Sequence, residues 1–322
     1  MNRIPQSPNS RLQTQGLHPL QKPPGIWGRR LFYRAQTWGI LALIALVSGV
    51  SGYLVLGSWG AVLLLLLVVG SFGALRVAPG DLVLRLQGGR ELSYHERPEL
   101  FEAVWELSRR AGLPVAPRLF LMPMPGVQAM STGSLRRPAL GITRGLLWHM
   151  EPRELFAILA HEVAHVSHGD MATLGLVQAL LRVTRLSALI GFLAVVANLL
   201  AALLGMQLVP AWIVWGLLIA PALVTLLTFA LSRVREFEAD LGAAELSGDP
   251  AALASALLRL EALSARLAPP WLRLELPSWL RTHPDTRERV RLLAELAPTP
   301  LRAPVARRGR QSFPPGYQFR FH

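Results

Sequence analysis

Five consecutive residues carry the strongest chemical signature in the chain: His161-Glu162-Val163-Ala164-His165. Side chains four residues apart lie on one face of a helix, so both imidazoles can reach one Zn²⁺ at about 2.0 to 2.1 Å. Glu162 then flanks the open coordination position, where it can take a proton from a metal-activated water and later give it to a leaving amine. The H-E-x-x-H spacing predicts a zinc hydrolase, although chance on an ordinary amphipathic helix is an alternative.

The two histidines leave the site short of a third protein ligand. The sequence contains 0 cysteines, so the remaining ligand must be a histidine or a carboxylate. His168 lies on the same helical face, but it is about 10.5 Å along the axis from His161, too far to share one ion. The metzincin pattern also fails, because His168 and Met171 stand where that pattern has Gly and His.

A later segment, Ser232 to Asp240, offers a carboxylate instead. If this segment is helical, Glu236 and Asp240 lie one turn apart on one face. Glu236 can then complete the metal site, while Asp240 accepts the remaining N–H of a ligand imidazole. A charge cluster beside the membrane, held by pairs one turn apart, is the alternative.

The composition indicates that these residues belong to a membrane protein. Hydrophobic residues make up 52% of the 322 residues, and the mean hydropathy is +0.36. Two blocks, Ala35 to Leu75 and Leu186 to Ser232, contain no charged residue. As one helix, each block would be about 60 Å long or more, twice the hydrocarbon thickness of about 30 Å. Each is therefore expected to form a hairpin, which gives four transmembrane helices.

Turn-forming residues indicate where each hairpin folds back. The cluster Gly57 to Gly60 predicts spans near Trp38 to Leu56 and Ala61 to Leu75, and the second block divides near Gln207 to Pro210. Arginines flank only the outer ends of the hairpins: Arg29, Arg30, Arg34, Arg76, Arg182, Arg185, Arg233 and Arg235. The positive-inside rule then predicts a multi-pass protein of a bacterial cytoplasmic membrane, with both termini and the active site in the cytoplasm.

The net charge of +13 does not indicate a nucleic-acid partner. The arginines are scattered and are not interleaved with aromatic residues on one module, and the basic flanks of membrane helices explain the same charge. The expected partners are protein or peptide substrates and the lipid bilayer. The sequence does not define the oligomeric state.

The chain therefore divides into alternating polar and apolar segments. We expect a disordered basic tail (1–34), a transmembrane hairpin (35–76), a first catalytic part with the H-E-x-x-H helix (77–185), a second hairpin (186–232), a second catalytic part with the third ligand (233–297), and another disordered basic tail (298–322). Within the catalytic parts, periodicity and helix-end signals predict helices at Arg97–Ala111, Pro152–His168, Arg233–Ser247, Pro250–Leu267 and Asp285–Leu296, and strands at Arg118–Met122, Gln128–Gly133 and Ala139–Thr143.

The chain resembles the HtpX membrane metalloprotease family, a group related to the CaaX prenyl-protein endopeptidases. The resemblance rests on the H-E-x-x-H motif with Asp170 five residues on, two following spans, and Ser232-Arg233-x-Arg235-Glu236-Phe237-x-Ala239-Asp240. It extends through Ala111-Gly112-Leu113-Pro114, Ala129-x-x-Thr132-Gly133 and Thr282-His283-Pro284. Two positions depart from the family pattern: Gln128 replaces the usual Asn, and Asp285 replaces the usual second Pro.

The resemblance implies an α+β gluzincin-type protease domain with a small edge-strand sheet beside the catalytic helix. It implies one Zn²⁺ per chain on His161, His165 and Glu236, and Glu162 as base. No other cofactor is expected. We also assign Asp170, together with Asp240, to the carboxylates that support the ligands. The implied activity is ATP-independent cleavage of misfolded or membrane proteins in quality control. The strand that would pair with an extended substrate comprises Gln128, Ala129, Met130, Ser131, Thr132 and Gly133.

Three alternatives remain open from the sequence. His283 can donate to the oxyanion formed at the scissile carbonyl, or it can form part of a helix cap with Pro284. The protein can be a scaffold with a structural zinc site, which would not require Glu162. It can also be an intramembrane protease, but Glu151, Arg153 and Glu154 before the motif and Asp170 after it leave too short an apolar run to span the bilayer.

Overall fold

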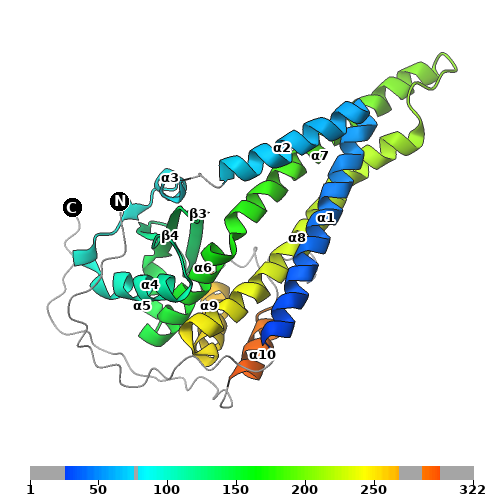
Figure 1. Ribbon diagram of the computed structural model, residues 1–322. Helices are drawn as coiled ribbons and strands as arrows, with labels where there is room; N and C mark the ends of the chain where they lie inside the picture. Colours follow the sequence, from blue (N-terminus) through cyan, green and yellow to red (C-terminus); the bar gives the residue numbers. More distant parts are fainter. Residues whose placement is uncertain (1–25, 76–78, 268–284, 298–322) are drawn as a thin grey trace.

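The computed structural model describes residues 26–75, 79–267 and 285–297 and combines a bundle of long apolar helices with a small mixed α/β part (Figure 1). Three of the described helices are long and apolar enough to cross a membrane: α1 (Ile26–Leu56), α7 (Asp170–Ala202) and α8 (Ala211–Ser247). Helix α2 (Ser58–Leu75) packs against α1 and α7 and contains a shorter apolar stretch, Ser58–Val68. The expected hairpin turns lie at Gly57 and between Ala202 and Ala211.

Two of the predicted boundaries in this bundle are wrong. Helix α1 begins at Ile26, so residues 26–34 are helical rather than part of a disordered tail. This extension is stabilised by tertiary contacts, since Tyr33 stacks on Phe237 with ring centroids 5.7 Å apart and Arg30 pairs with Glu245. The predicted helix Arg233–Ser247 is not separate, because it continues the last spanning helix as one 37-residue helix, α8.

The sheet has four strands in the order β1-β2-β4-β3. Their bounds are β1 (Arg90–Glu91), β2 (Arg118–Met122), β3 (Ala129–Ser134) and β4 (Arg137–Thr143). Strand β2 runs parallel to β4, whereas β1 and β3 are antiparallel to their neighbours. The three predicted strands are present within one or two residues, and β3 forms an edge of the sheet, next to α6.

The register of β3 determines which of its backbone groups point away from the sheet. Thr143 N donates to Gln128 O over 3.0 Å, and the paired residues continue from Ala129 with Ile142. Because bonded and non-bonded pairs alternate along an antiparallel ladder, Met130 pairs with β4 through its backbone. The backbone N–H and C=O groups of Ala129 and Ser131 therefore point toward the open edge.

The remaining helices surround the sheet and one hydrophobic core. Helices α4 (Pro98–Arg110), α6 (Pro152–His168), α9 (Pro250–Leu267) and α10 (Thr286–Leu296) lie where the sequence predicts them. Four short elements were not predicted: strand β1, α3 (Gly80–Leu86), the 3-10 helix η1 (Tyr94–Glu96) and α5 (Arg144–His149). The core joins the sheet to α4, α6, α8, α9 and α10 through residues such as Leu107, Ile142, Leu159, Ala239 and Leu293.

Candidate metal centre

Local signals fix both ends of α6, the helix that carries His161, Glu162 and His165. Pro152 occupies its first turn, and Glu151 and Glu154 form a reciprocal capping box. Gly169 ends the helix in the left-handed conformation, with φ of 71°. Glu154 also accepts hydrogen bonds of 2.7 Å from Arg259 and from Ser255 of α9, which anchors the start of α6. The motif therefore lies in the buried middle of a well-fixed helix.

Helix α8 approaches α6 closely at a glycine. A Cβ atom on Gly242 would lie 2.8 Å from Cβ of Ala164, so only glycine allows the two helices to pack at this distance. Glu236 is less than two turns before Gly242 on α8. The close packing brings its carboxylate to the face of α6 that carries the two histidines.

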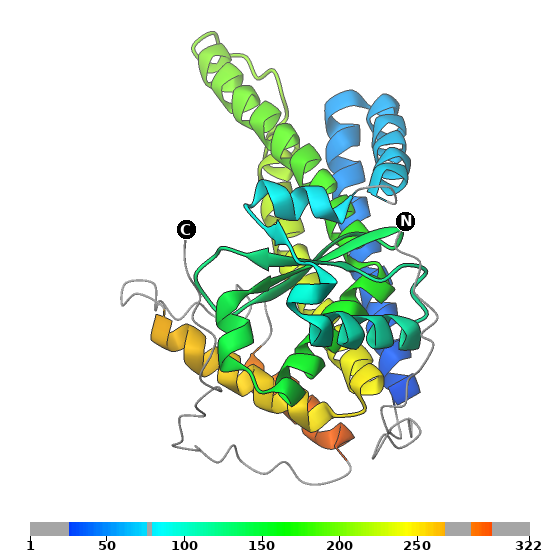
Figure 2. The same ribbon diagram turned by 90° about the vertical axis from the view of Figure 1, so that its left-hand side faces the viewer.

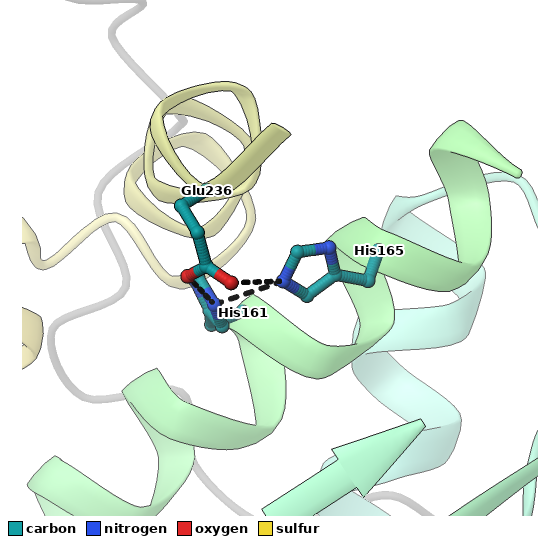
Figure 3. Close-up of side chains that lie close together, drawn as sticks. All are labelled: His161, His165 and Glu236. Atoms are coloured by element: carbon teal, nitrogen blue, oxygen red, sulfur yellow. Dashed lines mark hydrogen bonds and ion pairs between the residues drawn. The ribbon is translucent and has the colours of Figure 1, made fainter. Parts of the chain in front are cut away.

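His161, His165 and Glu236 point toward one another, as Figure 3 shows. The two Nε2 atoms are 3.0 Å apart, and Glu236 Oε2 and Oε1 lie 3.5 Å from His161 Nε2 and 3.9 Å from His165 Nε2. Ligand atoms bound tetrahedrally at about 2.0 to 2.1 Å from zinc are separated by about 3.3 to 3.4 Å. The donor set and its spacing therefore fit a zinc ion.

The ring nitrogens that face away from this cluster each meet a carboxylate. His165 Nδ1 lies 2.5 Å from Asp170 Oδ2, and because a carboxylate only accepts, Nδ1 must carry the proton. His161 Nδ1 lies 3.1 Å from Asp240 Oδ1, although it is not aligned as a regular hydrogen bond. Both contacts favour the tautomer that leaves Nε2 as a lone-pair donor toward the cluster.

Arg289 of α10 holds one of these carboxylates and was not identified from the sequence. Its Nε and Nη2 donate to the two oxygens of Asp240, each over 2.7 Å, and its Nη1 lies 3.1 Å from Glu236 Oε2. Only 8% of Arg289 is exposed. The one sequence signal was its position six residues after His283, within the segment that resembles the HtpX family.

Arg235 supports the other carboxylate in a second buried ion-pair group. It contacts both Asp170 and Glu238, and Arg34 of α1 lies 3.6 Å from Glu238 Oε1. From the sequence, Arg34 was interpreted as a marker of membrane orientation, and Arg235 as such a marker and as part of the motif that resembles the HtpX family. Arg235 is instead paired with Asp170, which contacts His165, and Arg34 is paired with Glu238, the second partner of Arg235. Helices α1 and α8 therefore both contribute to the surroundings of the cluster.

The electrostatics of the cluster favour one added positive charge. Burial lowers the pKa of His161, but its contacts with Asp240 and Glu236 outweigh burial and raise that pKa to about 9. Burial, with repulsion from His161, lowers the pKa of His165 to about 4. Burial raises the pKa of Asp240, but Arg289 and His161 together outweigh burial and lower that pKa, so this carboxylate stays ionised. Near neutral pH the two imidazoles together therefore carry one extra proton, at the place where a metal cation would be held.

The other predicted site residues, and His168, which was rejected as a ligand, lie at different places in the structure. Glu162 is buried on α6, and its charge is close enough to His165 to offset part of the lowering of that histidine's pKa. His168 lies beside Gly242, away from the cluster, with its Nδ1 buried. Residues 128–133 lie along β3, the strand next to α6. His283 lies outside the described residues, so its predicted role is not tested.

Comparisons with known proteins identify the family. The sequence model of peptidase family M48 matches residues 95–297. A protease HtpX homolog from Ralstonia nicotianae is 32% identical over 296 residues, which cover 84% of this chain and 98% of the relative. Another from Aquifex aeolicus is 31% identical over 272 residues, covering 76% of this chain and 86% of the relative. The chain therefore belongs to peptidase family M48, with the HtpX homologues, and is a membrane metalloendopeptidase.

Proposed function

We propose that this enzyme is a zinc endopeptidase of the bacterial cytoplasmic membrane that cleaves misfolded or membrane proteins from the cytoplasmic side. The observation that carries the proposal is the convergence of His161 Nε2, His165 Nε2 and the Glu236 carboxylate from two helices, with a carboxylate behind each imidazole. A structural zinc site would need no carboxylate next to its first histidine, whereas Glu162 occupies that position.

In this mechanism His161, His165 and Glu236 hold the zinc. Bound zinc would supply Lewis-acid chemistry, acidifying a water molecule and polarising the scissile carbonyl. Glu162 takes the proton of the attacking water and later delivers it to the nitrogen of the leaving amine. Asp170 and Asp240 keep the two imidazoles oriented during this cycle, and Arg289 keeps Asp240 in place. No covalent acyl-enzyme forms, because no serine or cysteine nucleophile takes part.

The substrate would bind in extended form along the open edge of β3. Ala129 and Ser131 direct their backbone donors and acceptors outward there, as an added strand requires. Because β3 lies next to α6, a chain paired to it would pass the cluster. Gln128 precedes this edge and differs from the family pattern, so it is a candidate for tuning substrate preference.

The proposed topology has four spans, with α2 completing the bundle of α1, α7 and α8. Helix α2 packs against two of these helices, as expected for a fourth span. Arginines at both outer ends of the bundle support a cytoplasmic location for the catalytic parts, of which 79–185, 233–267 and 285–297 are described. The tails before residue 26 and after residue 297 remain predictions from composition.

The decisive experiment compares cleavage of an unfolded reporter protein by purified zinc-loaded enzyme and by its Glu162→Gln variant, with bound zinc measured in both. Glu261→Gln, an exposed position on α9, serves as the matched control. We expect the parent and the control to cleave, and Glu162→Gln to retain zinc but lose turnover by at least about 1,000-fold. Equal cleavage by Glu162→Gln at equal zinc would disprove the mechanism.

A further inference from the structure

Helix α3 buries Leu84 against the sheet, and its two charged side chains pair with residues of neighbouring strands, whereas its other large aliphatic side chains point outward. Arg85 donates to Glu91 over 2.6 Å, and Asp81 accepts from Arg118 over 2.6 Å. The outward face consists of large aliphatic residues with high exposed fractions: Leu82 at 52%, Val83 at 43% and Leu86 at 79%. A surface helix in water usually carries polar residues on its outward face, so these three exposed aliphatic side chains indicate an apolar environment.

The position of α3 identifies the bilayer as that environment. Four residues separate Leu75, the last residue of α2, from Gly80, so their Cα atoms are at most about 18 Å apart. Figure 1 shows α3 next to this end of α2, and Figure 2 shows it over the sheet on the side from which the apolar helices extend. The outward face of α3 therefore lies near the level where the apolar bundle ends.

We propose that α3 lies in the headgroup region of the bilayer, with Leu82, Val83 and Leu86 inserted at the boundary of the acyl chains. The neighbouring β3–β4 turn adds to the same surface, because Leu135 is 43% exposed and Arg136 and Arg137 are exposed beside it. A short apolar face next to arginines is the chemistry that binds anionic lipid surfaces.

Helix α3, the proposed membrane anchor, packs tightly against the edge strand β3. Thr132 Oγ1 donates to Gly80 O over 2.9 Å, and a Cβ atom on Gly80 would lie 2.5 Å from Thr132 O. Helix α3 therefore holds the Thr132–Gly133 end of β3 and leaves Ala129 and Ser131 as the open part of the edge. This inference rests on the proposed function, in which β3 binds the substrate. With α3 in the bilayer surface, the enzyme prefers substrate segments that leave the bilayer in extended form.

The location of α3 can be tested without relying on catalysis. The chain contains 0 cysteines, so a fluorescent probe can be attached to one introduced cysteine in the Glu162→Gln variant. Leu86→Cys is compared with Leu63→Cys on the apolar helix α2 and with Glu99→Cys on α4, in vesicles of phosphatidylcholine and phosphatidylglycerol. We expect nitroxide-labelled lipids to quench the probes at positions 86 and 63 at least about twofold more than the probe at position 99.

Two results would overturn the proposal. Quenching at position 86 equal to that at position 99 would place α3 in water. Shielding of position 86 from aqueous quenchers without lipid quenching, together with energy transfer between labelled chains, would mean that a second copy covers the face. Neither readout depends on proteolysis, so a failure of the proposed function would not affect them.

The consequence for substrates requires an activity measurement. The double variant Leu82→Asn, Leu86→Asn is assayed on one cleavable sequence, either free in solution or tethered close to a membrane anchor. We expect cleavage of the tethered form to fall about 10-fold, with the free form changed less than about twofold. Equal effects on both forms would contradict the substrate inference, whereas no cleavage by the parent would instead contradict the proposed function.

Discussion

Arg289 binds Asp240 through two parallel hydrogen bonds of 2.7 Å, although the residues are 49 positions apart and lie on different helices. The same guanidinium lies 3.1 Å from Glu236 Oε2, so α10 fixes two carboxylates of the cluster at once. Helices α8 and α10 are thereby joined behind the candidate zinc ligands. A bidentate arginine pair of this kind resists reorientation better than a lysine contact.

Arg289→Met should therefore destabilise the fold and weaken zinc binding. Removal of one partner from a buried ion pair leaves Asp240 uncompensated, which costs about 3 to 5 kcal/mol. Zinc affinity, measured by competition with a chelator, should fall about 10- to 100-fold because Asp240 and Glu236 lose their orientation. Arg287→Met, two residues away and exposed on the same helix, is the matched control. Equal zinc affinity in both variants would contradict the role of Arg289.

Asp170→Asn should separate zinc binding from catalysis. The variant keeps the size of the side chain but loses the charge that fixes the Nδ1 proton of His165 at 2.5 Å. We expect zinc affinity to fall about 10- to 100-fold and much of the turnover to return at saturating zinc. Asp249→Asn, in an ion pair with Arg153 outside the cluster, should change neither quantity. Unchanged zinc affinity in Asp170→Asn would show that the contact does not position His165.

The lowered pKa of buried His168 predicts that the folded state loses stability in acid. Burial, with repulsion from Arg235, lowers the pKa of His168 to about 3. The folded state therefore binds the proton less readily than the unfolded state, whose histidine pKa is about 6.5. The stability contributed by neutral His168 is complete above about pH 6.5 and is lost as the pH falls toward 3.

His168→Gln should reduce this acid dependence. Between pH 6.5 and pH 5, the parent should lose about 2 kcal/mol more folding free energy than the variant. Unfolding is followed in detergent with a chelator present, so that both proteins are metal-free and the contributions of His161 and His165 cancel in the comparison. Parallel pH profiles for the two proteins would mean that His168 is not held neutral.

Because α3 packs closely on β3, adding one methyl group at Gly80 should lower the stability of the fold. Gly80→Ala places a Cβ atom 2.5 Å from Thr132 O, and this overpacking should cost about 1 to 3 kcal/mol. Gly39→Ala in α1 is the control, since a Cβ atom there meets nothing within 4 Å. Thermal unfolding measures both, and an unchanged melting temperature in Gly80→Ala would show that α3 is not fixed to the strand.

The sequence predicted elements whose ends carry local signals. Pro152 and Gly169 define α6, and the boundaries of that helix and of β2 match the structure. Helix α3 and strand β1 were missed because seven and two residues are too few for a periodic pattern. The extension of α1 before Arg34 was missed because its stability comes from contacts with α8, not from its own composition.

The candidate ligands were predictable for a similar reason. His161 and His165 are related by helical spacing alone, whereas Glu236 required the resemblance to a family as well as its spacing from Asp240. Arg289 and Arg235 were not assigned because their roles depend on how separate helices pack, which no local pattern encodes. In this chain, helical spacing and the family resemblance predicted the candidate ligands, and tertiary packing determined the charges that orient them.

The register of β3 allows a final test of the substrate edge. Proline removes a backbone N–H, which an edge strand tolerates only where that group does not pair within the sheet. Ser131→Pro should therefore leave folding and zinc content near those of the parent but reduce kcat/KM for an extended peptide by at least about 10-fold, since one outward donor is lost. Met130→Pro removes a bond to β4 and should instead lower the melting temperature. Full activity in a folded Ser131→Pro variant would exclude pairing of the substrate at this position.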